Sequence, residues 1–297
     1  MGLAPRAVLV FRRTELDELL ARHGTRGQAA FFLRTRGRDL DEVEQRHEAQ
    51  RAALAEVSAA VPADWRRGLL EREDVSRFLF APDDVVVVVG QDGLVANAAK
   101  YLDGQPVVGV NPDPGRNPGV LVPHAPRAVR NLLPEVVGSG RPVELRTMVE
   151  AVTDDGLRLR ALNEIYVGSA THQTARYELR APGRPPEPQA SSGLLVGTGT
   201  GATGWCRSAW LERQSDIVLP TPVEAGLAWF VREAWPSPAS GTSWTEGRCE
   251  TGQALEIQVR SDRLVAFGDG IEADALQLSW GQSVRIAVAM KHLRLVR

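Results

Sequence analysis

The segment "VVVVVGQDGLVANAAK", residues 85–100, joins five valines directly to Gly-Gln-Asp-Gly and then to a helix-forming stretch. A continuous β-branched run is typical of a strand buried on both faces, as in a parallel sheet covered by helices. Such sheets collect ligands at the carboxyl ends of their strands, where helix N-termini favour phosphate. The segment therefore predicts a strand that carries one carboxylate, Asp92, to a ligand-binding edge. A simple turn in which Asp92 caps the next helix is an equal alternative.

The rest of the first half alternates between strand-like and helix-like patterns. Residues 6–11 ("RAVLVF") are apolar and β-prone, and Thr14 then opens a helix for which Gly24 is the stop signal. A long charged helix is predicted over residues 39–61, and "QPVVGVN" (residues 105–111) predicts another short strand. Strands that alternate with helices predict an α/β fold, a doubly wound parallel sheet with helices on both faces.

The second half has a different pattern. From about residue 143, short apolar runs are separated by Gly, Pro and Asp turns, which is typical of antiparallel strands. We therefore expect an α/β lobe over residues 1–142, which carries the Gly-x-Asp-Gly loop, and a mostly antiparallel, β-rich lobe over residues 143–297. Whether the last residues return to the first lobe is left open. The Pro-rich residues 180–192 predict an exposed loop.

Composition limits the functions to consider. A net charge of −2 over 297 residues argues against a protein that coats nucleic acid or anionic membrane. Cys206 and Cys249 are too few for a disulfide framework, which favours a reducing compartment. No apolar run reaches the length of a membrane span, and strand-like sequence near Ala7 leaves no room for a signal peptide. We expect a soluble, cytoplasmic protein whose ligands are small molecules.

A glycine- and threonine-rich loop lies within "SSGLLVGTGTGATGW", residues 191–205. Its Gly-x-Gly-x-x-Gly spacing formally matches the dinucleotide fingerprint of dehydrogenases, with Asp216 as a ribose partner. That fingerprint should open a βαβ unit, whereas the chain beyond it is antiparallel and Pro-rich. The loop is better interpreted as a cradle of backbone N–H groups and hydroxyls for phosphate or ribose oxygens, or as a tight turn. The hydroxyls belong to Thr198, Thr200 and Thr203.

Asn163 and Glu164 are adjacent near the start of a predicted strand, "ALNEIYVG" (residues 161–168). Successive side chains of a strand point to opposite faces, so both can bind one ligand only at a strand end or a bulge. From these residues alone, a hydrated strand edge is the more frequent situation.

Taken in order, these motifs resemble those of the NAD kinases, and most of all those of the mitochondrial-type branch and its bacterial relatives. The resemblance implies the two-lobe NAD kinase fold, and phosphoryl transfer from ATP or another donor to the adenosine-ribose 2′-hydroxyl of NAD(H), giving NADP(H). The segments that carry it are "EQRHEAQ" (44–50), "VVGVNPDPGRNPGVL" (107–121), "ALNEIYVG" (161–168), "SSGLLVGTGTGATGW" (191–205), "WFVREAW" (229–235) and "FGDGIEA" (267–273).

The same resemblance assigns roles to individual residues. Asp92 matches the aspartate that helps to deprotonate or orient the acceptor hydroxyl, within a phosphate loop of Gly90, Gln91 and Gly93. The matches to NAD-binding positions are Asn163, Glu164, Ser192, Thr200, Gly201, Thr203, Gly204, Trp205 and Ser208. Further candidates are Asn111, Asp269 and Arg116. For Arg116, a solvated loop residue is an equal alternative.

The resemblance also implies Mg²⁺, which would supply most of the positive charge and would not be held by protein side chains alone. It implies a homodimer or a higher homo-oligomer as well. The tryptophans of the second lobe either form an aromatic surface that such an interface could bury or fill the core of that lobe. The tryptophans concerned are Trp205, Trp210, Trp229 and Trp235.

The chain departs from the family pattern at one place. The family has Gly-Gly-Asp-Gly-Thr, whereas this chain has Gln91 and Leu94 at the second and fifth positions. A glycine-only conformation at Gln91 would cost on the order of 1 kcal/mol, and Leu94 lacks a hydroxyl. Three readings therefore stay open: an active NAD kinase, a catalytically weakened NAD(H)- or NADP(H)-binding homologue, and a kinase for another acceptor, such as a nucleoside or a lipid alcohol. The antiparallel second half disfavours a Rossmann dehydrogenase.

Overall fold

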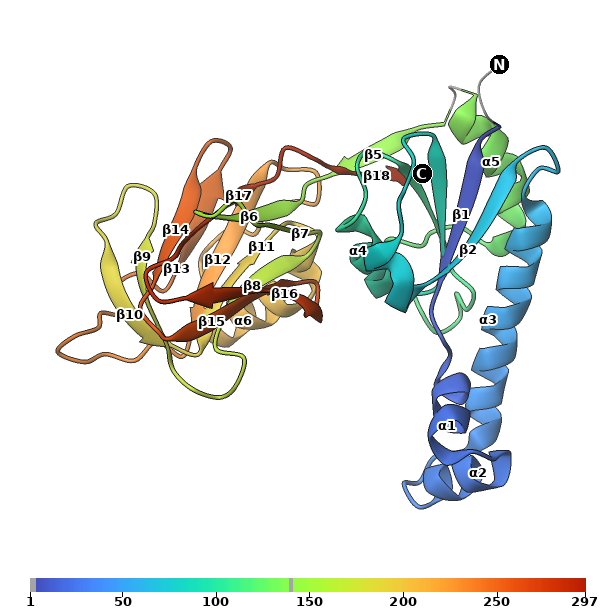
Figure 1. Ribbon diagram of the computed structural model, residues 1–297, viewed down its shortest axis with the longest axis horizontal. Coiled ribbons are helices and arrows are strands. Elements are labelled where there is room, and N and C mark those ends of the chain that lie inside the picture. Colours follow the sequence, from blue (N-terminus) through green and yellow to red (C-terminus); the bar gives the residue numbers. More distant parts are fainter. Residues whose placement is uncertain (1–3, 139–140) are drawn as a thin grey trace. The chain divides into compact units, whose positions relative to one another are not determined.

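The computed structural model describes residues 4–138 and 141–297, which fold into two compact units (Figure 1). Unit 1 comprises Met1–Glu144 and Arg294–Arg297, and unit 2 comprises Leu145–Leu293. Each unit has its own sheet system and its own hydrophobic core. None of the helices found in the described ranges is long and apolar enough to cross a membrane.

Unit 1 is built on a six-stranded sheet with the order β2-β1-β3-β4-β18-β5. Its strands are β1 (Arg6–Phe11), β2 (Arg66–Glu71), β3 (Asp84–Val89), β4 (Pro106–Val110), β5 (Val143–Arg146) and β18 (Leu293–Val296). The neighbours from β2 to β18 pair in parallel. The predicted parallel sheet is confirmed, and the last strand of the chain lies within it beside β4.

Helices cover both faces of this sheet. α3 (Leu40–Ala60) and α5 (Val129–Val137) pack on the face that carries Val85, Val87 and Val89. The alternate valines of β3 are also fully buried, and α4 (Asp92–Ala99) lies against β4. Because successive side chains of a strand point to opposite faces, burial on both sides explains why β3 is an unbroken valine run.

The first helix begins and ends as the sequence predicts. α1 (Glu15–His23) is capped by Thr14, whose hydroxyl accepts a hydrogen bond from the Asp17 N–H, while the Asp17 carboxylate accepts one from the Thr14 N–H. Gly24 ends the helix with φ 78°, a conformation that glycine adopts without a Cβ clash.

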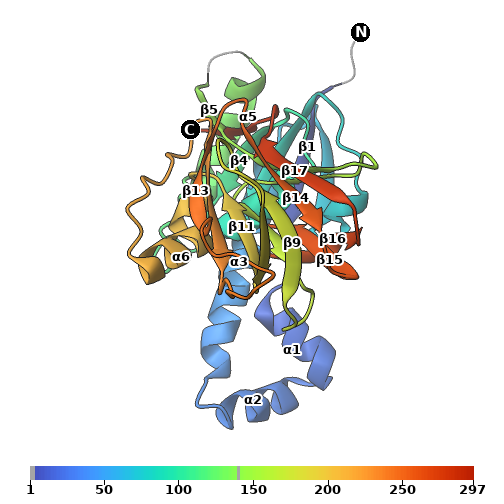
Figure 2. The ribbon, with the colours of Figure 1, turned by 90° about the vertical axis from the view of Figure 1, so that its left-hand side faces the viewer.

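Two elements of unit 1 are not predicted from the sequence, α2 (Arg26–Arg34) and β2. α2 packs with α1 and the start of α3 around Leu16, Leu19 and Leu33, and in both ribbon views the pair lies beside that end of α3 (Figure 2). β2 is an edge strand in which only Leu70 is buried, so its apolar pattern is weak. Contacts with neighbouring elements stabilise both α2 and β2, and the local sequence pattern of either segment does not predict it.

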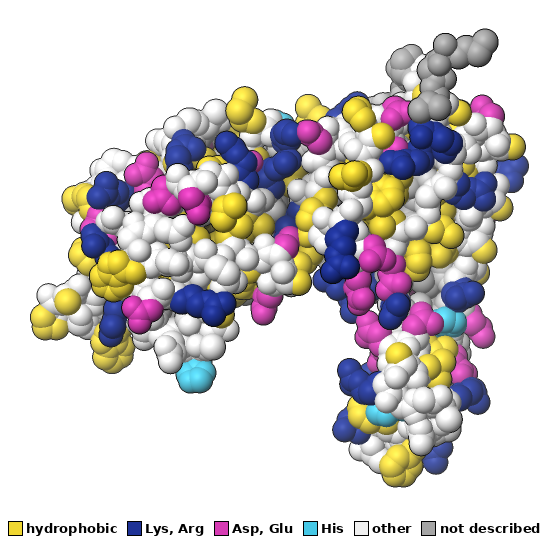
Figure 3. All heavy atoms as spheres, in the orientation of Figure 1, with side chains coloured by type: hydrophobic (Ala, Val, Ile, Leu, Met, Phe, Trp, Pro, Cys, Tyr) yellow, Lys and Arg dark blue, Asp and Glu magenta, His cyan; other side chains and the backbone are white. Residues whose placement is uncertain are grey.

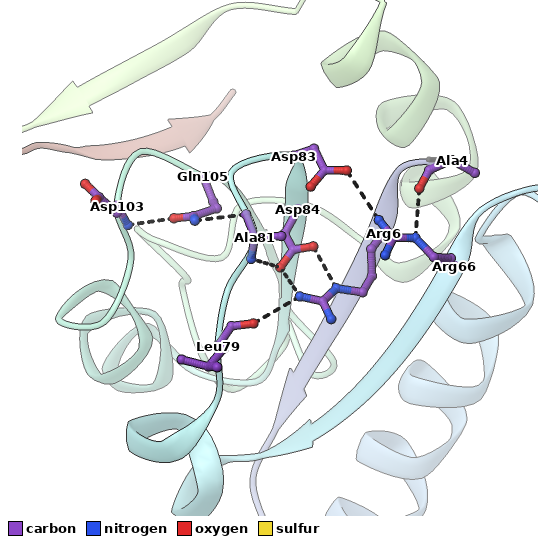
Figure 4. Close-up of polar contacts among 9 residues, drawn as sticks. All are labelled: Ala4, Arg6, Arg66, Leu79, Ala81, Asp83, Asp84, Asp103 and Gln105. Atoms are coloured by element: carbon purple, nitrogen blue, oxygen red, sulfur yellow. Dashed lines mark hydrogen bonds and ion pairs between the residues drawn. The ribbon is translucent and has the colours of Figure 1, made fainter. Parts of the chain in front are cut away.

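A polar network closes the amino-terminal end of β3 (Figure 4). The fully buried Asp84 carboxylate accepts hydrogen bonds from the Arg6 guanidinium, at 2.7 Å from Nε and 2.6 Å from Nη2, and from the Ala81 N–H at 2.7 Å. The Arg6 Nη2 atom also donates to the Leu79 carbonyl, and the Gln105 amide donates to the Ala81 carbonyl. Because a buried carboxylate is tolerated only when it is paired, this network fixes β1 against β3 and the loop before β3.

The network gives a stability prediction for unit 1. Asp84→Ala leaves the Arg6 charge partly buried without a partner, so we expect the free energy of unfolding to fall by about 3 kcal/mol. The matched control is Asp83→Ala, which removes a pair with Arg66 between two exposed side chains and should cost less than about 0.5 kcal/mol. Urea unfolding followed by far-UV circular dichroism measures both, and equal losses would contradict the assignment.

Unit 2 consists of two six-stranded antiparallel sheets, with the orders β10-β9-β14-β17-β6-β7 and β13-β12-β11-β8-β15-β16. The first contains β6 (Val149–Thr153), β7 (Arg158–Ala161), β9 (Ala175–Arg180), β10 (Glu187–Ser191), β14 (Ala254–Val259) and β17 (Ser283–Val288). The second contains β8 (Glu164–Gly168), β11 (Gly193–Gly197), β12 (Gly226–Arg232), β13 (Glu246–Glu250), β15 (Arg263–Gly268) and β16 (Ile271–Ser279). One core that includes Trp229 and Tyr177 joins side chains of both sheets, so the predicted antiparallel lobe is confirmed.

The Pro-rich segment is only partly the exposed loop predicted for residues 180–192. Its second half is β10, an edge strand paired with β9, in which Gln189 and Ser191 are buried. Pro188 is compatible with this strand because an edge position does not need its missing N–H. The loop prediction is therefore wrong for Glu187–Ser191, because it relied on proline content alone.

Candidate functional site

The Gly-Gln-Asp-Gly loop of unit 1 connects the carboxyl end of β3 to the start of α4. Gln91 is the N-cap residue with φ −98°, an extended conformation open to any residue, so the backbone cost considered for Gln91 does not arise. Leu94 is buried, and a Cβ atom on Gly90 would lie 3.0 Å from its side chain. Leu94 therefore packs beneath the loop, where a threonine hydroxyl would also be buried.

Backbone donors are available at the start of α4. The first N–H groups of a helix have no intrahelical acceptor. Those of Gln91, Asp92 and Gly93 have no acceptor in the described part of the chain either. Gly93 is exposed, and no atom lies within 4 Å of the place where its Cβ would be. The arrangement offers N–H groups and open space to an anion.

The Asp92 carboxylate is held by the loop that follows β4. It accepts hydrogen bonds from the backbone N–H groups of Val120, at 3.0 Å, and Leu121, at 2.8 Å. Asp92 therefore does not cap its own helix, since Gln91 occupies the N-cap position. Each carboxylate oxygen keeps a further lone pair for another donor.

Asn111 shapes the same loop from a buried position, whereas the Arg116 side chain is exposed on it. The buried Asn111 side chain donates to the Asn117 carbonyl at 2.8 Å and accepts from the Asp113 N–H at 3.0 Å. Arg116 is exposed, with its Nε atom 3.9 Å from Asp113 Oδ2. Gly119 has φ 67° and lies too close to Asn111 to carry a side chain.

In unit 2, a single carboxylate holds the Leu-Asn-Glu turn before β8. Asp269 accepts hydrogen bonds from the N–H groups of Leu162 at 2.8 Å, Asn163 at 2.7 Å and Glu164 at 3.4 Å, and its own N–H donates to the Glu164 carbonyl. Asp269 and Gly270 form the two-residue turn between β15 and β16, with φ values of 54° and 67°, as Asp-Gly hairpins do. The site is thus built on a hairpin turn.

Asn163 and Glu164 satisfy the geometric condition for acting on one ligand. Glu164 is the first residue of β8 and Asn163 precedes the strand, so the pair lies at a strand end. Within unit 2, neither side chain makes a hydrogen bond to another residue. Both remain available to a ligand, although their backbone is fixed.

The Thr-Gly-Thr-Gly loop packs directly on this turn. The Thr198 hydroxyl donates to the Leu162 carbonyl at 2.6 Å and accepts from the Thr200 N–H, and the Thr198 N–H donates to the Asn163 carbonyl. A Cβ atom on Gly201 would lie 2.3 Å from that carbonyl oxygen, so only glycine fits. The proposal that the Thr198 hydroxyl binds phosphate is wrong, because the side chain is buried and used internally.

The other predicted positions of this loop differ in exposure. The Thr200 side chain is buried and accepts a hydrogen bond from Arg146 at 3.2 Å. Thr203, Gly204 and Ser208 are exposed around the short helix η3 (Gly201–Thr203) and the start of α6 (Trp205–Arg213). Sequence analysis therefore grouped internal and accessible positions together.

The sequence analysis named Trp205 but missed the two aromatic side chains grouped with it beside the loop, Tyr166 and Phe267. Trp205 stacks on Tyr166 with ring centroids 5.6 Å apart, and Tyr166 contacts its cross-strand partner Phe267 at 5.0 Å. The Tyr166 hydroxyl donates to the Ser192 carbonyl at 2.7 Å, and the Arg232 guanidinium lies 5.2 Å from the Trp205 ring. The signal was present in the aromatic residues of β8 and β15, but their pairing depends on strand register.

Electrostatics single out Glu164. Burial, and secondarily the nearby Asp269 charge, raise the pKa of its carboxyl to about 8. A carboxyl with this pKa is mostly protonated near neutral pH, and it can then donate a hydrogen bond as well as accept one. No group of three or more His, Cys, Asp or Glu residues in the described ranges is arranged to hold a metal ion.

Comparisons with known proteins find similarity to several NAD kinases. The NAD kinase of Caldicellulosiruptor saccharolyticus is 25% identical over 217 residues, which cover 71% of this chain and 76% of that protein. The NAD kinase of Mycobacterium tuberculosis is 29% identical over 223 residues, covering 70% and 67%. The mitochondrial NAD kinase 2 of Rattus norvegicus is 31% identical over 169 residues, covering 41% of this chain but only 39% of the relative. No model of a protein family matches the chain.

The matched relatives and the observed fold agree with the resemblance in the motifs. The chain is similar to curated NAD kinases of bacterial and mitochondrial type, and this similarity supports membership of the NAD kinase family. This relationship supports a kinase-type enzyme.

The raised pKa of Glu164 predicts a pH-dependent stability. The folded state binds the proton more tightly than the unfolded state, whose pKa is near 4.5, so this stability is complete below pH 4.5 and is lost as the pH rises to about 8. Glu164→Gln mimics the protonated carboxyl, so it should raise the free energy of unfolding above that of the native chain at pH 9. This difference between variant and native chain should be a few kcal/mol larger at pH 9 than at pH 5. Chemical unfolding at several pH values measures this. The exposed Glu212→Gln on α6 is the control, and a pH-independent difference for Glu164→Gln would contradict the assignment.

Proposed function

We propose that the protein is an NAD kinase, which transfers the terminal phosphoryl group of ATP or another donor to the adenosine-ribose 2′-hydroxyl of NAD(H), giving NADP(H). The observation that carries the proposal is the junction of the Leu-Asn-Glu turn with the Thr-Gly-Thr-Gly loop in unit 2. Asp269 and Thr198 fix its backbone, while the side chains of Asn163 and Glu164 remain free for a ligand. The relatives named NAD kinase support the same conclusion.

In this proposal, unit 2 recognises NAD. Asn163 and the protonated Glu164 bind ribose hydroxyls, since the amide and the neutral carboxyl both donate and accept hydrogen bonds. Trp205, stacked on Tyr166, offers an aromatic face to the adenine. The remaining positions proposed to contact NAD are Ser192, Thr200, Gly201, Thr203, Gly204 and Ser208.

The start of α4 is proposed to receive the phosphates of the donor. The free N–H groups of Gln91, Asp92 and Gly93 would donate to phosphate oxygens, and Gly93 leaves room for their approach. Mg²⁺ neutralises charge on the transferred group when it is bound, and the donor phosphates would provide most of its ligands.

Asp92 is proposed to accept a hydrogen bond from the 2′-hydroxyl and to orient it for attack. Phosphoryl transfer needs alignment more than covalent help, and a positioned base contributes about 10²–10⁴-fold. The two N–H bonds from Val120 and Leu121 hold the carboxylate in one orientation, as a positioned base requires.

Those same bonds favour a second candidate, a non-catalytic NAD(H)- or NADP(H)-binding homologue. In that case Asp92 serves only to hold the loop after β4. The two candidates differ in whether the carboxylate contributes to turnover beyond its effect on the loop.

The test is formation of NADP from NAD, ATP and Mg²⁺ by the purified chain and by Asp92→Asn. We expect turnover by Asp92→Asn to fall about 10²-fold or more with NAD affinity changed only a few-fold, because a base acts mainly in the transition state. The control is Asn111→Ala, which loosens the same loop but keeps the carboxylate. Equal losses in both variants would contradict the role of Asp92. A native chain that binds NAD but stays inert with ATP, other triphosphates and polyphosphate would favour the second candidate.

Assembly into a homodimer or higher homo-oligomer stays a prediction. Trp229 is buried in the core of unit 2, and Trp205 and Trp210 are half-buried against its second hydrophobic cluster. Trp235 is exposed and is the tryptophan of this set that is most available to an interface. Mass measurement at micromolar concentration is expected to give at least twice 32.3 kDa, and a monomer would contradict the prediction.

A further inference from the structure

The segment from the end of α1 through α2, residues 22–38, carries a positive charge that the proposed function does not use. Residues 22–38 contain five arginines and one histidine but no aspartate or glutamate, although the whole chain has a net charge of −2. Figure 3 shows Lys/Arg, His and hydrophobic side chains side by side at this end of unit 1.

The arginines of this segment fall into two groups. Arg26 forms an ion pair with Glu44, and Arg38 forms one with Glu15, so these two tie this segment to α3 and α1. Arg22 and Arg36 have no carboxylate partner among residues 4–138 and 141–297. Their charge is therefore not neutralised within the fold.

Arg34 also lacks a carboxylate partner in the described ranges, but of these three arginines only Arg22 and Arg36 line one hollow. Its volume is about 530 Å³, and its lining includes Arg22, His23, Gln28, Phe31, Phe32 and Arg36. The Arg36 guanidinium lies 3.8 Å from the centroid of the Phe32 ring, and the centroid of the His23 ring lies 4.4 Å from that same centroid. Phe31 remains 68% exposed at the edge of this hollow.

We propose that this hollow is a second nucleotide-binding site, separate from the proposed catalytic residues, which takes a nucleoside phosphate such as ATP. The volume falls within the range of small-molecule sites, about 300–1,000 Å³. Guanidinium groups without carboxylate partners bind phosphate oxygens through paired N–H donors. An exposed phenylalanine ring gives a base a face on which to stack, and the Gln28 amide can bond to its edge.

The structure points to a nucleotide rather than to a bare anion, because the hollow combines cationic and aromatic surface. None of the described residues that line it is acidic. A simple phosphate would engage the arginines and leave Phe31 exposed, whereas a nucleotide covers both.

The test is isothermal titration calorimetry of the full-length chain with ATP. We expect Arg22→Ala/Arg36→Ala to bind one ATP fewer per chain than the native protein, or to bind that ATP at least tenfold more weakly. Arg34→Ala, which removes an exposed arginine of α2 outside the hollow, should match the native chain. Unchanged ATP binding by the double variant overturns the proposal, as does an equal loss in Arg34→Ala, which would indicate general attraction of anions.

A second variant tests the aromatic part. Phe31→Ala is expected to weaken ATP binding about fivefold and to leave pyrophosphate binding unchanged, and an equal effect on both ligands overturns the nucleotide assignment. The outcome is independent of the proposed catalysis. If the catalytic site does not bind ATP, the native chain should bind one ATP and the double variant none.

Discussion

The hydrogen bonds from the Leu-Asn-Glu turn to the Asp269 carboxylate are the constraint on which the functional part of unit 2 depends. Three consecutive N–H groups converge on one side chain, which itself lies at the tip of a tight hairpin. The turn then has a fixed shape, against which Thr198 and Gly201 can pack closely. Without the carboxylate, these donors would lie in a largely enclosed region without partners, which is costly.

Three carboxyl groups that the motifs single out differ in their surroundings, and their roles differ accordingly. Asp92 and Asp269 each accept backbone N–H bonds, which fix the side chain in one orientation. Glu164 has no such donors and lies near a negative charge, so its pKa rises to about 8. Two anchored carboxylates therefore organise loops, while the third keeps a proton to offer a ligand.

Much of the fold could be predicted from local pattern. The valine run, the capping residues of α1 and the change to short alternating strands near residue 143 each reflect a local periodicity. Elements stabilised mainly by neighbours could not be predicted, as α2, β2 and β10 illustrate. In β10, the partner strand β9 outweighs the presence of Pro188, since pairing at an edge needs only alternate backbone groups.

The sequence by itself determined the alternation of strands and helices in the first half, the change to antiparallel strands near residue 143, the motifs and the resemblance to the NAD kinases, because these depend on residues close together in the chain. Only the tertiary structure decided which members of each motif are used internally. Thr198 and Thr200 look alike in sequence to Thr203, yet only Thr203 is exposed. Tyr166 pairs with Phe267, and the Asn163 N–H donates to the Asp269 carboxylate. Both contacts join residues about a hundred positions apart. Such contacts follow from strand register. Register is set by the burial of a whole sheet face, which a local sequence pattern does not encode.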